Sequence, residues 1–462
     1  MPKARIKKIA VTGLQGHFSY EIEFRNDNQN IVLIAPNGYG KTAFLSLINS
    51  CLQFKLLSAS RIKFDTLTVT FDDKTKWKFE RKVEIAQRQS KYDRERKSSR
   101  ITQIVKVYLI DAKGKESPLL SIPDINSESF ESLARVVERS IPSISRVGPN
   151  DFRDFRTSEM FDLSQVMERY RETVEGDSEI ALYMQRFAPD AFKEQEHRLN
   201  CVFIETQRLL LAAKMSAKSG NEGRLEPEEE IVRQVQSLAA NLASTHSSYA
   251  SISQELDRSF PNRLIERATT VSAPPDLERL RSDLEAIESK RKALTEAGIL
   301  VETTAHVVAP GDKLLPAIGD TLQIYIEDSR KKLSTFDEVY KRVSLFKHLV
   351  NKKLWRKSVS VSRDTGISIF SEKERLDITQ LSSGEKHEFV MLFRLIFETP
   401  ENSIVLIDEP EISLHVVWQL EFMSDLREIQ SISPFQAIIA THSPQVSQGW
   451  DDITFDLDEQ VK

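Results

Sequence analysis

The sequence predicts an α/β fold that is interrupted by a helical insertion, and three observations lead to this prediction. First, the apolar run "NIVLIA" leads into a loop with two glycines and then into an apolar helix. Second, the later runs "SIVLIDE" and "AIIATH" each end in polar residues, as strands of a buried parallel sheet do at a ligand-binding edge. Third, the intervening region 213–355 has apolar residues mostly at helical spacing.

The composition sets limits on the class of protein. The 462 residues suffice for two or three domains, and 64 Lys and Arg against 69 Asp and Glu give a net charge of −5. The overall charge does not attract nucleic acid, so any site for a polyanion has to be formed by a local group of residues. The two cysteines, Cys51 and Cys201, form no C-x-x-C pair, which argues against a disulfide scaffold or a zinc site. No stretch reaches the ~18 apolar residues of a membrane span, so we expect a cytoplasmic protein without a membrane partner.

Strands are predicted for much of the first part of the chain. Three strands are expected within 5–34, and alternating apolar residues over 65–85 and around 104–110 predict antiparallel pairing. Residues 125–198 are predicted to be helical and irregular. The segment 81–100 holds eight basic residues. A solvated hairpin loop is the favoured interpretation of this segment, and a loop that touches DNA is the alternative.

Two apolar series define the helical insertion. Apolar residues recur over 277–294 and again over 333–354, which predicts an antiparallel helical hairpin with arms about 40 Å long. Ordinary amphipathic core helices are the alternative. The prediction divides the chain into an N-terminal lobe, the insertion and a C-terminal lobe, at 1–212, 213–355 and 356–462.

The glycine loop matches the phosphate-loop pattern Gly/Ala-x-x-x-x-Gly-Lys-Ser/Thr, with Ala35 in place of the first glycine. Such a loop closes its backbone N–H groups around phosphate oxygens at a helix N-terminus. Lys41 is expected to reach the β- and γ-phosphates, and the Thr42 hydroxyl to bind Mg²⁺. The predicted nucleotide-binding residues are Asn37, Gly38, Tyr39, Gly40, Lys41, Thr42 and Ala43.

Polar residues at the ends of other strands complete the predicted ATP and Mg²⁺ site. Asp408 suits Mg²⁺, and Glu409 suits a general base for the water that attacks the γ-phosphate. His442 is placed to sense that phosphate, although a histidine after a strand is usually structural. Gln207, at the end of "FIETQ", can meet both Mg²⁺ and the attacking water.

The segment "LSSGE" has two interpretations. Ser382 and Glu385 form a capping box at the start of an amphipathic helix, as any such helix could. Alternatively, Ser383 and Gly384 form a second helix N-terminus that receives a γ-phosphate. Because Lys41 already begins one such helix, this second one would serve a nucleotide bound elsewhere.

The order of these motifs resembles the ABC-type ATPase heads of the RecF, SMC and OLD families, over about 1–60, 200–212 and 356–450. The resemblance implies an ABC-type P-loop ATPase head with a short coiled-coil insertion. It also implies a head-to-head homodimer in which a signature, Ser382 to Glu385, completes the partner's site. By the same resemblance Gln207 is the Q-loop residue, His442 the switch histidine and 413–415 the D-loop. "LSSGE" and "EPEISLH" depart from the transporter forms "LSGGQ" and "EPTSALD", which argues against a transporter subunit.

Among these families the chain is most similar to compact ATPases of bacterial anti-phage systems, in particular the ATPase subunit of PARIS. This resemblance rests on size, the short hairpin and "FIETQRLL". It implies a homodimer or higher homo-oligomer, a separate effector subunit (a Toprim-type nuclease) and a phage-encoded trigger protein. A nuclease in this chain is not expected, because OLD nucleases carry a Toprim domain after the head and only 20 residues follow His442 here. The alternatives are a DNA-repair ATPase of RecF or SMC type that binds duplex DNA, and a Septu- or retron-type defence ATPase.

Overall fold

The computed structural model divides the chain into two compact units, each assembled from separate stretches of sequence. The first unit comprises 1–206, 400–411 and 433–462, and the second comprises 207–399 and 412–432. The structure describes residues 4–25, 29–88, 98–121, 128–148, 151–155, 160–163, 166, 170, 195, 198–206, 230–269, 276–301, 315–372 and 374–460. Within these ranges no helix is long and apolar enough to cross a bilayer.

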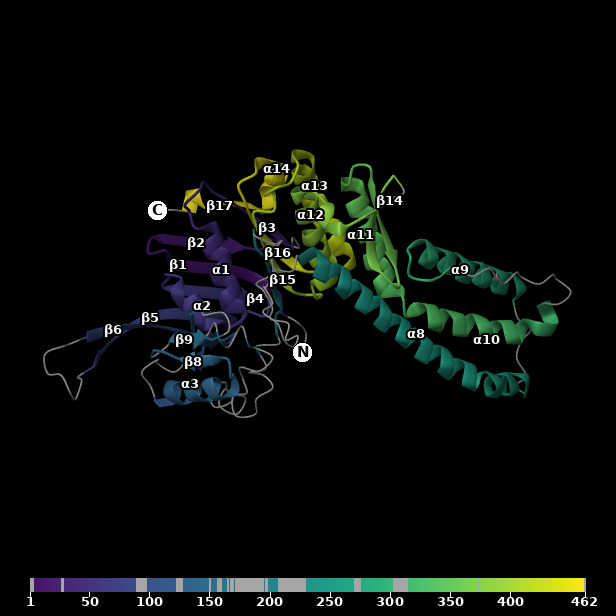
Figure 1. Cartoon of the computed structure of the whole chain (residues 1–462), viewed down its shortest axis with the longest axis horizontal. Helices are drawn as coiled ribbons and strands as arrows, with labels where there is room; N and C mark the ends of the chain where they lie inside the picture. The colour runs from purple at the N-terminus through teal and green to yellow at the C-terminus, as the bar shows by residue number, and fades with distance from the viewer. Residues whose placement is uncertain are drawn as a thin grey trace. The chain divides into compact units, whose positions relative to one another are not determined.

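A five-stranded parallel sheet forms the base of the first unit (Figure 1). Its strands, in spatial order, are β11 (Cys201–Ile204), β15 (Ile404–Asp408), β16 (Gln436–Thr441), β3 (Asn30–Ile34) and β17 (Thr454–Asp456). Every residue of β15 and β16 is buried, as continuous apolar runs require in a parallel sheet. The α/β fold class is confirmed, and the carboxyl ends of β3, β15 and β16 meet at one edge.

A six-stranded antiparallel sheet forms the second layer of this unit. Its strands, in spatial order, are β2 (Phe18–Glu23), β1 (Ile6–Leu14), β4 (Thr66–Phe71), β5 (Lys76–Arg88), β6 (Ser98–Ile110) and β7 (Glu116–Ser121). The predicted antiparallel strands over 65–85 and near 104–110 are confirmed. Residues 89–97 of the basic segment lie outside the described residues. The first strand is tied to a late one, because the Gln436 side chain accepts a hydrogen bond from Ile6 N and donates one to Ile6 O, each 2.8 Å long.

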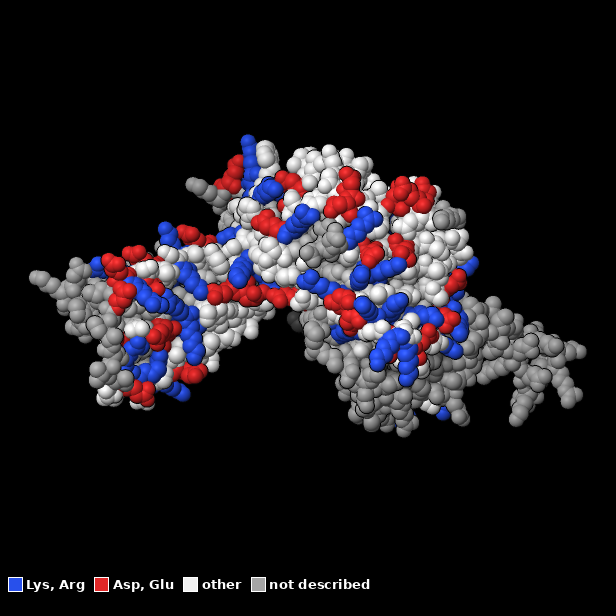
Figure 2. Space-filling model, turned by 180° about the vertical axis from the view of Figure 1, so that it is seen from behind, with Lys and Arg blue, Asp and Glu red and all other residues white. Residues whose placement is uncertain are grey.

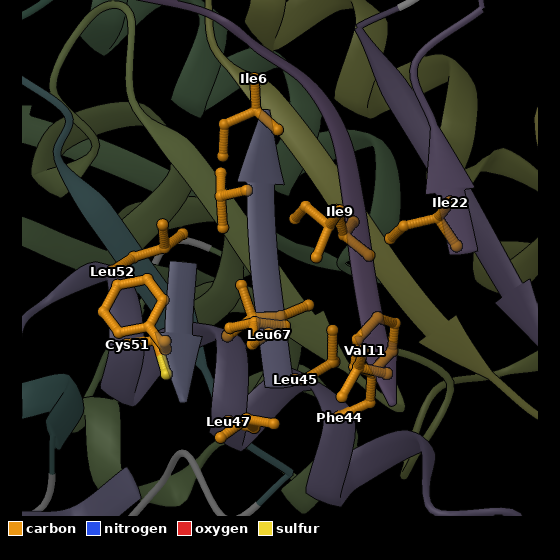
Figure 3. Close-up of a cluster of buried hydrophobic side chains, with 14 of the residues drawn as sticks. Ile6, Ile9, Val11, Ile22, Phe44, Leu45, Leu47, Cys51, Leu52 and Leu67 are labelled. Atoms are coloured by element: carbon orange, nitrogen blue, oxygen red, sulfur yellow. The ribbon is translucent and has the colours of Figure 1, made fainter. Parts of the chain in front are cut away.

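One hydrophobic core joins residues of both sheets and of helix α1 (Lys41–Leu52). Figure 3 shows side chains of β1 and β4 together with those of α1, including Phe44, Leu45 and Leu47. Helix α2 (Leu56–Arg61) follows α1 and adds Leu56 and Ala59 to this core. Because each fully buried large side chain contributes about 1.5–3 kcal/mol, this core holds the start of α1 in place.

A smaller subdomain of the first unit has a core of its own. It consists of α3 (Glu128–Ser140) and the antiparallel strands β8 (Ile144–Arg146), β9 (Asp151–Asp154) and β10 (Met160–Asp162). Phe130 and Phe152 are buried in its core. The sequence predicted only helical and irregular structure here, because strands of three or four residues are too short to show an alternating pattern.

The described part of the second unit begins at residue 230 with a run of four helices. They are α8 (Glu230–Thr269), α9 (Leu277–Glu296), α10 (Leu315–Ser334) and α11 (Asp337–Lys353). The predicted helical insertion is confirmed, and Leu280, Leu284 and Ile287 of α9 are buried as expected. The predicted pairing was incomplete, because the series over 333–354 is divided between α10 and α11, and α10 packs against both α8 and α9.

The rest of the second unit carries the "LSSGE" segment. Its elements are β12 (Lys357–Ser362), β13 (Gly366–Ser371), β14 (Glu374–Leu376), η1 (Ile378–Gln380), α12 (Ser383–Phe393), the π-helical turn η2 (Arg394–Glu398) and α13 (Val416–Ile432). Helix α12 packs against α8 and α11. The first unit ends with α14 (Pro444–Ser447), η3 (Asp451–Ile453) and η4 (Asp458–Gln460).

Candidate functional site

The loop between β3 and α1 has the backbone shape that a phosphate loop needs. Gly38 and Gly40 have φ values of 92° and 73°, in the left-handed region that a side chain disfavours. Gly40 is also the residue that caps α1, so the first N–H groups of this helix face the loop. The sequence folds this way because the core holds the apolar residues on either side of the loop, in β3 and α1.

Most of the predicted site residues of the first unit line one cavity of about 230 Å³, and Asp408 lies behind its wall in contact with Thr42. Its wall consists of Gln15, Asn37, Gly38, Tyr39, Gly40, Lys41, Thr42, Ala43, Glu409 and His442. All seven predicted nucleotide-binding residues, the predicted base and the predicted sensor are therefore brought together. Gln207 lies outside the described residues.

Lys41 is buried and makes three close contacts. Its Nζ donates hydrogen bonds to the carbonyl oxygens of Ala35 (2.6 Å) and Pro36 (3.4 Å) and lies 3.2 Å from Nδ1 of His442. Burial lowers the pKa of Lys41, and the carboxylates of the site act in the opposite direction. Because a lysine ammonium can only donate, we infer that Nδ1 accepts in this contact and that His442 carries its proton on Nε2, which lies 3.5 Å from Glu409 Oε1.

Asp408 is buried at the end of β15 and accepts hydrogen bonds from two hydroxyl groups. The Thr42 Oγ1 lies 3.0 Å and the Thr206 Oγ1 lies 3.1 Å from its Oδ2 atom. Burial raises the pKa of Asp408, against the effect of these hydrogen bonds and of Lys41. The pair of a threonine hydroxyl and a carboxylate in direct contact fits Mg²⁺, which prefers oxygen ligands.

Glu409 has a strained backbone. Its φ of 46° lies in the left-handed region, and its N–H donates to Ala440 O at 2.8 Å, across to β16. Such conformations cost about 1–3 kcal/mol and are concentrated at functional sites. Here the strain accompanies a side chain that faces the cavity beside Lys41 and His442.

Sequence reasoning missed three residues of this site. Glu411 Oε1 accepts hydrogen bonds from the backbone N–H of His442 (2.6 Å) and of Ser443 (3.1 Å), and so holds the strand end that carries the histidine. Thr206 contacts Asp408, and Gln15 reaches the cavity from the turn after β1. The sequence signals were weak: Glu411 belongs to the same acidic run as Glu409, and Thr206 directly precedes Gln207.

The predicted signature residues lie in the second unit and form the expected capping box. Ser382 Oγ accepts from Glu385 N at 3.3 Å, and Glu385 Oε2 accepts from Ser382 N at 2.8 Å. Ser383 begins α12. Gly384 packs so tightly on the 413–415 segment that a Cβ there would collide with the backbone oxygen of Ser413. The glycine is therefore required by this contact, whatever else it does.

Among the comparisons with known proteins, the match to a family model agrees with the phosphate-loop geometry. A family model described as "AAA ATPase domain" matches residues 5–446. A curated relative, Protein ea59 of Escherichia phage lambda, is 31% identical over 129 residues, which cover 27% of this chain and 24% of that protein. Two solved structures of Smc head domains each align with 96% of this chain and 91% of theirs. The one from Pyrococcus furiosus, with an extended coiled coil and bound to the C-terminal domain of ScpA, is 12% identical with a TM-score of 0.30. The other, bound to the C-winged helix domain of ScpA, is 10% identical with a TM-score of 0.34.

Proposed function

The chain belongs to the AAA ATPase domain family, and on that premise we propose that it binds and hydrolyses ATP in the cavity formed by the loop after β3. The observation that carries the proposal is that all seven loop residues, Glu409 and His442 line this one cavity. Their positions follow from the parallel sheet, which brings the ends of β3, β15 and β16 to one edge.

Each residue has a task in the proposed reaction. The loop N–H groups bind the phosphates, and Lys41 exchanges the carbonyl oxygens of Ala35 and Pro36 for phosphate oxygens. Thr42 and Asp408 would hold Mg²⁺, which supplies charge neutralisation when bound. Glu409 orients the attacking water and accepts its proton, and His442 positions Glu409 through Nε2.

The test of ATP binding is Lys41→Ala. We expect the affinity for ATP in a calorimetric titration to fall at least about 100-fold, because the loop loses its one cation and the phosphates lose a charge-assisted contact. Lys7→Ala is the matched control, since Lys7 lies on β1 of the same unit and is exposed. Unchanged affinity in Lys41→Ala would refute the proposed site.

We further propose a homodimer in which Ser382, Ser383, Gly384 and Glu385 of one subunit complete the ATP site of the other. The surface beside this segment supports the proposal. Val416, Val417 and Leu420 of α13 are exposed to 53%, 51% and 48%. They follow the 413–415 segment on which Gly384 packs. Adjacent exposed apolar side chains of this kind mark protein interfaces. A higher homo-oligomer built from such dimers is compatible with the same surface.

The dimer is tested with Glu409→Gln, which keeps the shape of the side chain but cannot accept the proton. We expect ATP to remain bound, hydrolysis to fall at least about 100-fold, and light scattering to show a dimer that forms only with ATP. Adding Leu420→Glu should abolish this dimer, because a charge enters an apolar contact. Glu401→Gln, on the surface of the first unit, is the control. Turnover at the wild-type rate in Glu409→Gln would assign the base to another residue.

In the cell, we propose, this ATPase is the sensor and scaffold subunit of an anti-phage complex that holds a separate effector, a Toprim-type nuclease, until a phage-encoded trigger binds. The order of motifs and the helical insertion support the proposal, since both termini of the insertion lead into lobes that carry site residues. A trigger can act only if it binds one ATP-dependent state more tightly than the other. The test is affinity purification of the Glu409→Gln protein from its own host. Recovery of a nuclease subunit would support the proposal, and recovery of the ATPase alone, with and without ATP, would contradict it.

A further inference from the structure

We propose that Lys357 is a positioning residue of the signature, Ser382 to Glu385. It neutralises the charge of Glu385, so that this acidic side chain can occupy a helix N-terminus that is proposed to receive a phosphate. The inference rests on the proposed role of Ser382 to Glu385 in the partner's ATP site. It adds a residue outside the "LSSGE" segment to that site, from the strand that follows the helical insertion.

The contact between the two side chains is bidentate. Lys357 Nζ donates to Glu385 Oε1 at 2.7 Å and to Oε2 at 2.8 Å. The side chains of Lys357 and Glu385 are 23% and 11% exposed, so the two charges are largely removed from water while they are paired. Oε2 also accepts the hydrogen bond from Ser382 N. The lysine therefore fixes the same carboxylate that closes the capping box.

Glu385 needs a counter-charge for a physical reason. Burial acts to raise the pKa of Glu385, but the hydrogen bonds from Lys357 and Ser382 outweigh it and hold the pKa below its usual value. The side chain is thus an anion near neutral pH. An unpaired anion in the first turn of α12 would repel the phosphate that this helix N-terminus is proposed to attract. Paired with Lys357, the carboxylate keeps the cap and adds no net charge.

The lysine is held in place by the element that carries it. Lys357 pairs with Ser371 at the start of the β12–β13 hairpin, and Val359 N donates to Asn351 Oδ1 of α11 at 2.7 Å. Its ammonium group is consequently fixed relative to the last helix of the insertion. This ion pair therefore links the strand after that helix to the signature turn, in addition to the direct packing of α11 on α12.

The test is a double-mutant cycle in the Glu409→Gln protein, with Lys357→Met, Glu385→Gln and both together. We expect Lys357→Met to weaken ATP-dependent dimerisation about 10-fold, and to weaken it less than about 2-fold when Glu385 is already glutamine. ATP affinity, which depends on the cavity of the first unit, is the internal control. The conservative variant Lys357→Arg should retain dimerisation, because it keeps the charge.

Salt distinguishes charge compensation from a merely structural role. An unpaired carboxylate is screened by added salt, so the deficit of Lys357→Met relative to its parent should shrink at high ionic strength, whereas a packing defect should not respond. Equal dimerisation of Lys357→Met and its parent, or an undiminished deficit in the double variant, would overturn the inference while leaving the proposed dimer intact. If the parent itself binds ATP but forms no dimer, the proposed role of the signature fails, and this inference fails with it.

Discussion

Lys41, His442 and Glu409 form a connected chain of polar contacts. Lys41 lies against carbonyl oxygens of its own loop, and the histidine lies between the lysine and the base. In the proposed reaction, phosphate oxygens would replace these contacts of Lys41 and would thereby free His442 Nδ1. The three residues that we propose to act in hydrolysis therefore hold one another in position.

Thr206 gives a prediction at this scale. Thr206→Val removes the hydroxyl that donates to Asp408, while Thr206→Ser keeps it. Because partners of a metal-binding carboxylate tune the metal site by about 10–100-fold, we expect the valine variant to need at least about 10-fold more Mg²⁺ for half-maximal hydrolysis. The measurement is phosphate release against Mg²⁺ concentration. Equal Mg²⁺ requirements in the two variants would show that this hydroxyl is dispensable.

The sequence predicted some site residues and not others, for reasons that lie in the motifs. Gly40, Lys41 and Asp408 belong to short patterns in which neighbours in sequence act together. Gln15 lies in a turn whose own sequence has no such pattern, and Thr206 lies within "FIETQ", where the prediction chose the neighbouring Gln207. The predicted role of Gln207 stays a prediction.

At the scale of elements, burial on both faces made β15 and β16 predictable, because each is a continuous apolar run. Helix partners were harder to predict. A helical series shows which face is buried but not which helix covers it, and so the packing of α10 against both α8 and α9 was missed.

Three elements of the second unit meet at one buried ion cluster. Lys353, the last residue of α11, lies 2.7 Å from Glu388 of α12 and 2.7 Å from Asp425 of α13. The three side chains are only 2%, 4% and 6% exposed. Burial acts to lower the pKa of Lys353, but the two carboxylates outweigh it and the pKa is raised. Removal of the lysine would leave two buried anions without this counter-charge.

Lys353→Met should therefore lower the free energy of unfolding by about 3–5 kcal/mol at neutral pH. The pKa of this lysine is higher in the folded than in the unfolded protein. Its contribution to the stability of the fold is therefore complete at pH values below the unfolded-state pKa, and it is lost as the pH rises through the folded-state pKa. The difference between wild type and variant should accordingly persist up to about pH 10.5 and shrink above it. Chemical denaturation across pH measures it, with Lys341→Met on the exposed face of α11 as control. A difference that does not change with pH would rule out the ion pair as its source.

For the molecule as a whole, charge bears on the choice between a sensor and a DNA-repair ATPase. Figure 2 shows Lys and Arg lying among Asp and Glu over the described surface in view. On the antiparallel sheet several lysines have acidic partners, with Lys8 at 2.5 Å from Glu21 and Lys78 at 3.5 Å from Glu116. Lysines that are already paired with carboxylates would release few counterions when DNA binds. This surface therefore favours the sensor proposal over the DNA-repair ATPase.

We expect the purified protein to bind duplex DNA weakly, with a shallow dependence of log K on log salt, and to cleave no plasmid or single-stranded DNA. Fluorescence anisotropy over a range of salt concentrations measures DNA binding. Incubation of the protein with each DNA, Mg²⁺ or Mn²⁺, and ATP tests for cleavage. A slope of about −5 or steeper would support the repair ATPase instead. Cleavage that is lost in Glu409→Gln would place effector chemistry in this chain.

The position of β3 in its sheet has a consequence for synthesis on the ribosome. Among the described strands, β3, which leads into the phosphate loop, pairs with β16 and β17, and β1 is tied to Gln436, 430 positions after Ile6. A nascent chain therefore carries its glycine loop without these two neighbouring strands until β16 and β17 have been made. Contacts of such long range fold slowly. Prematurely terminated products should accordingly be unable to bind nucleotide, so that ATP binding itself marks a chain whose translation has reached β16 and β17.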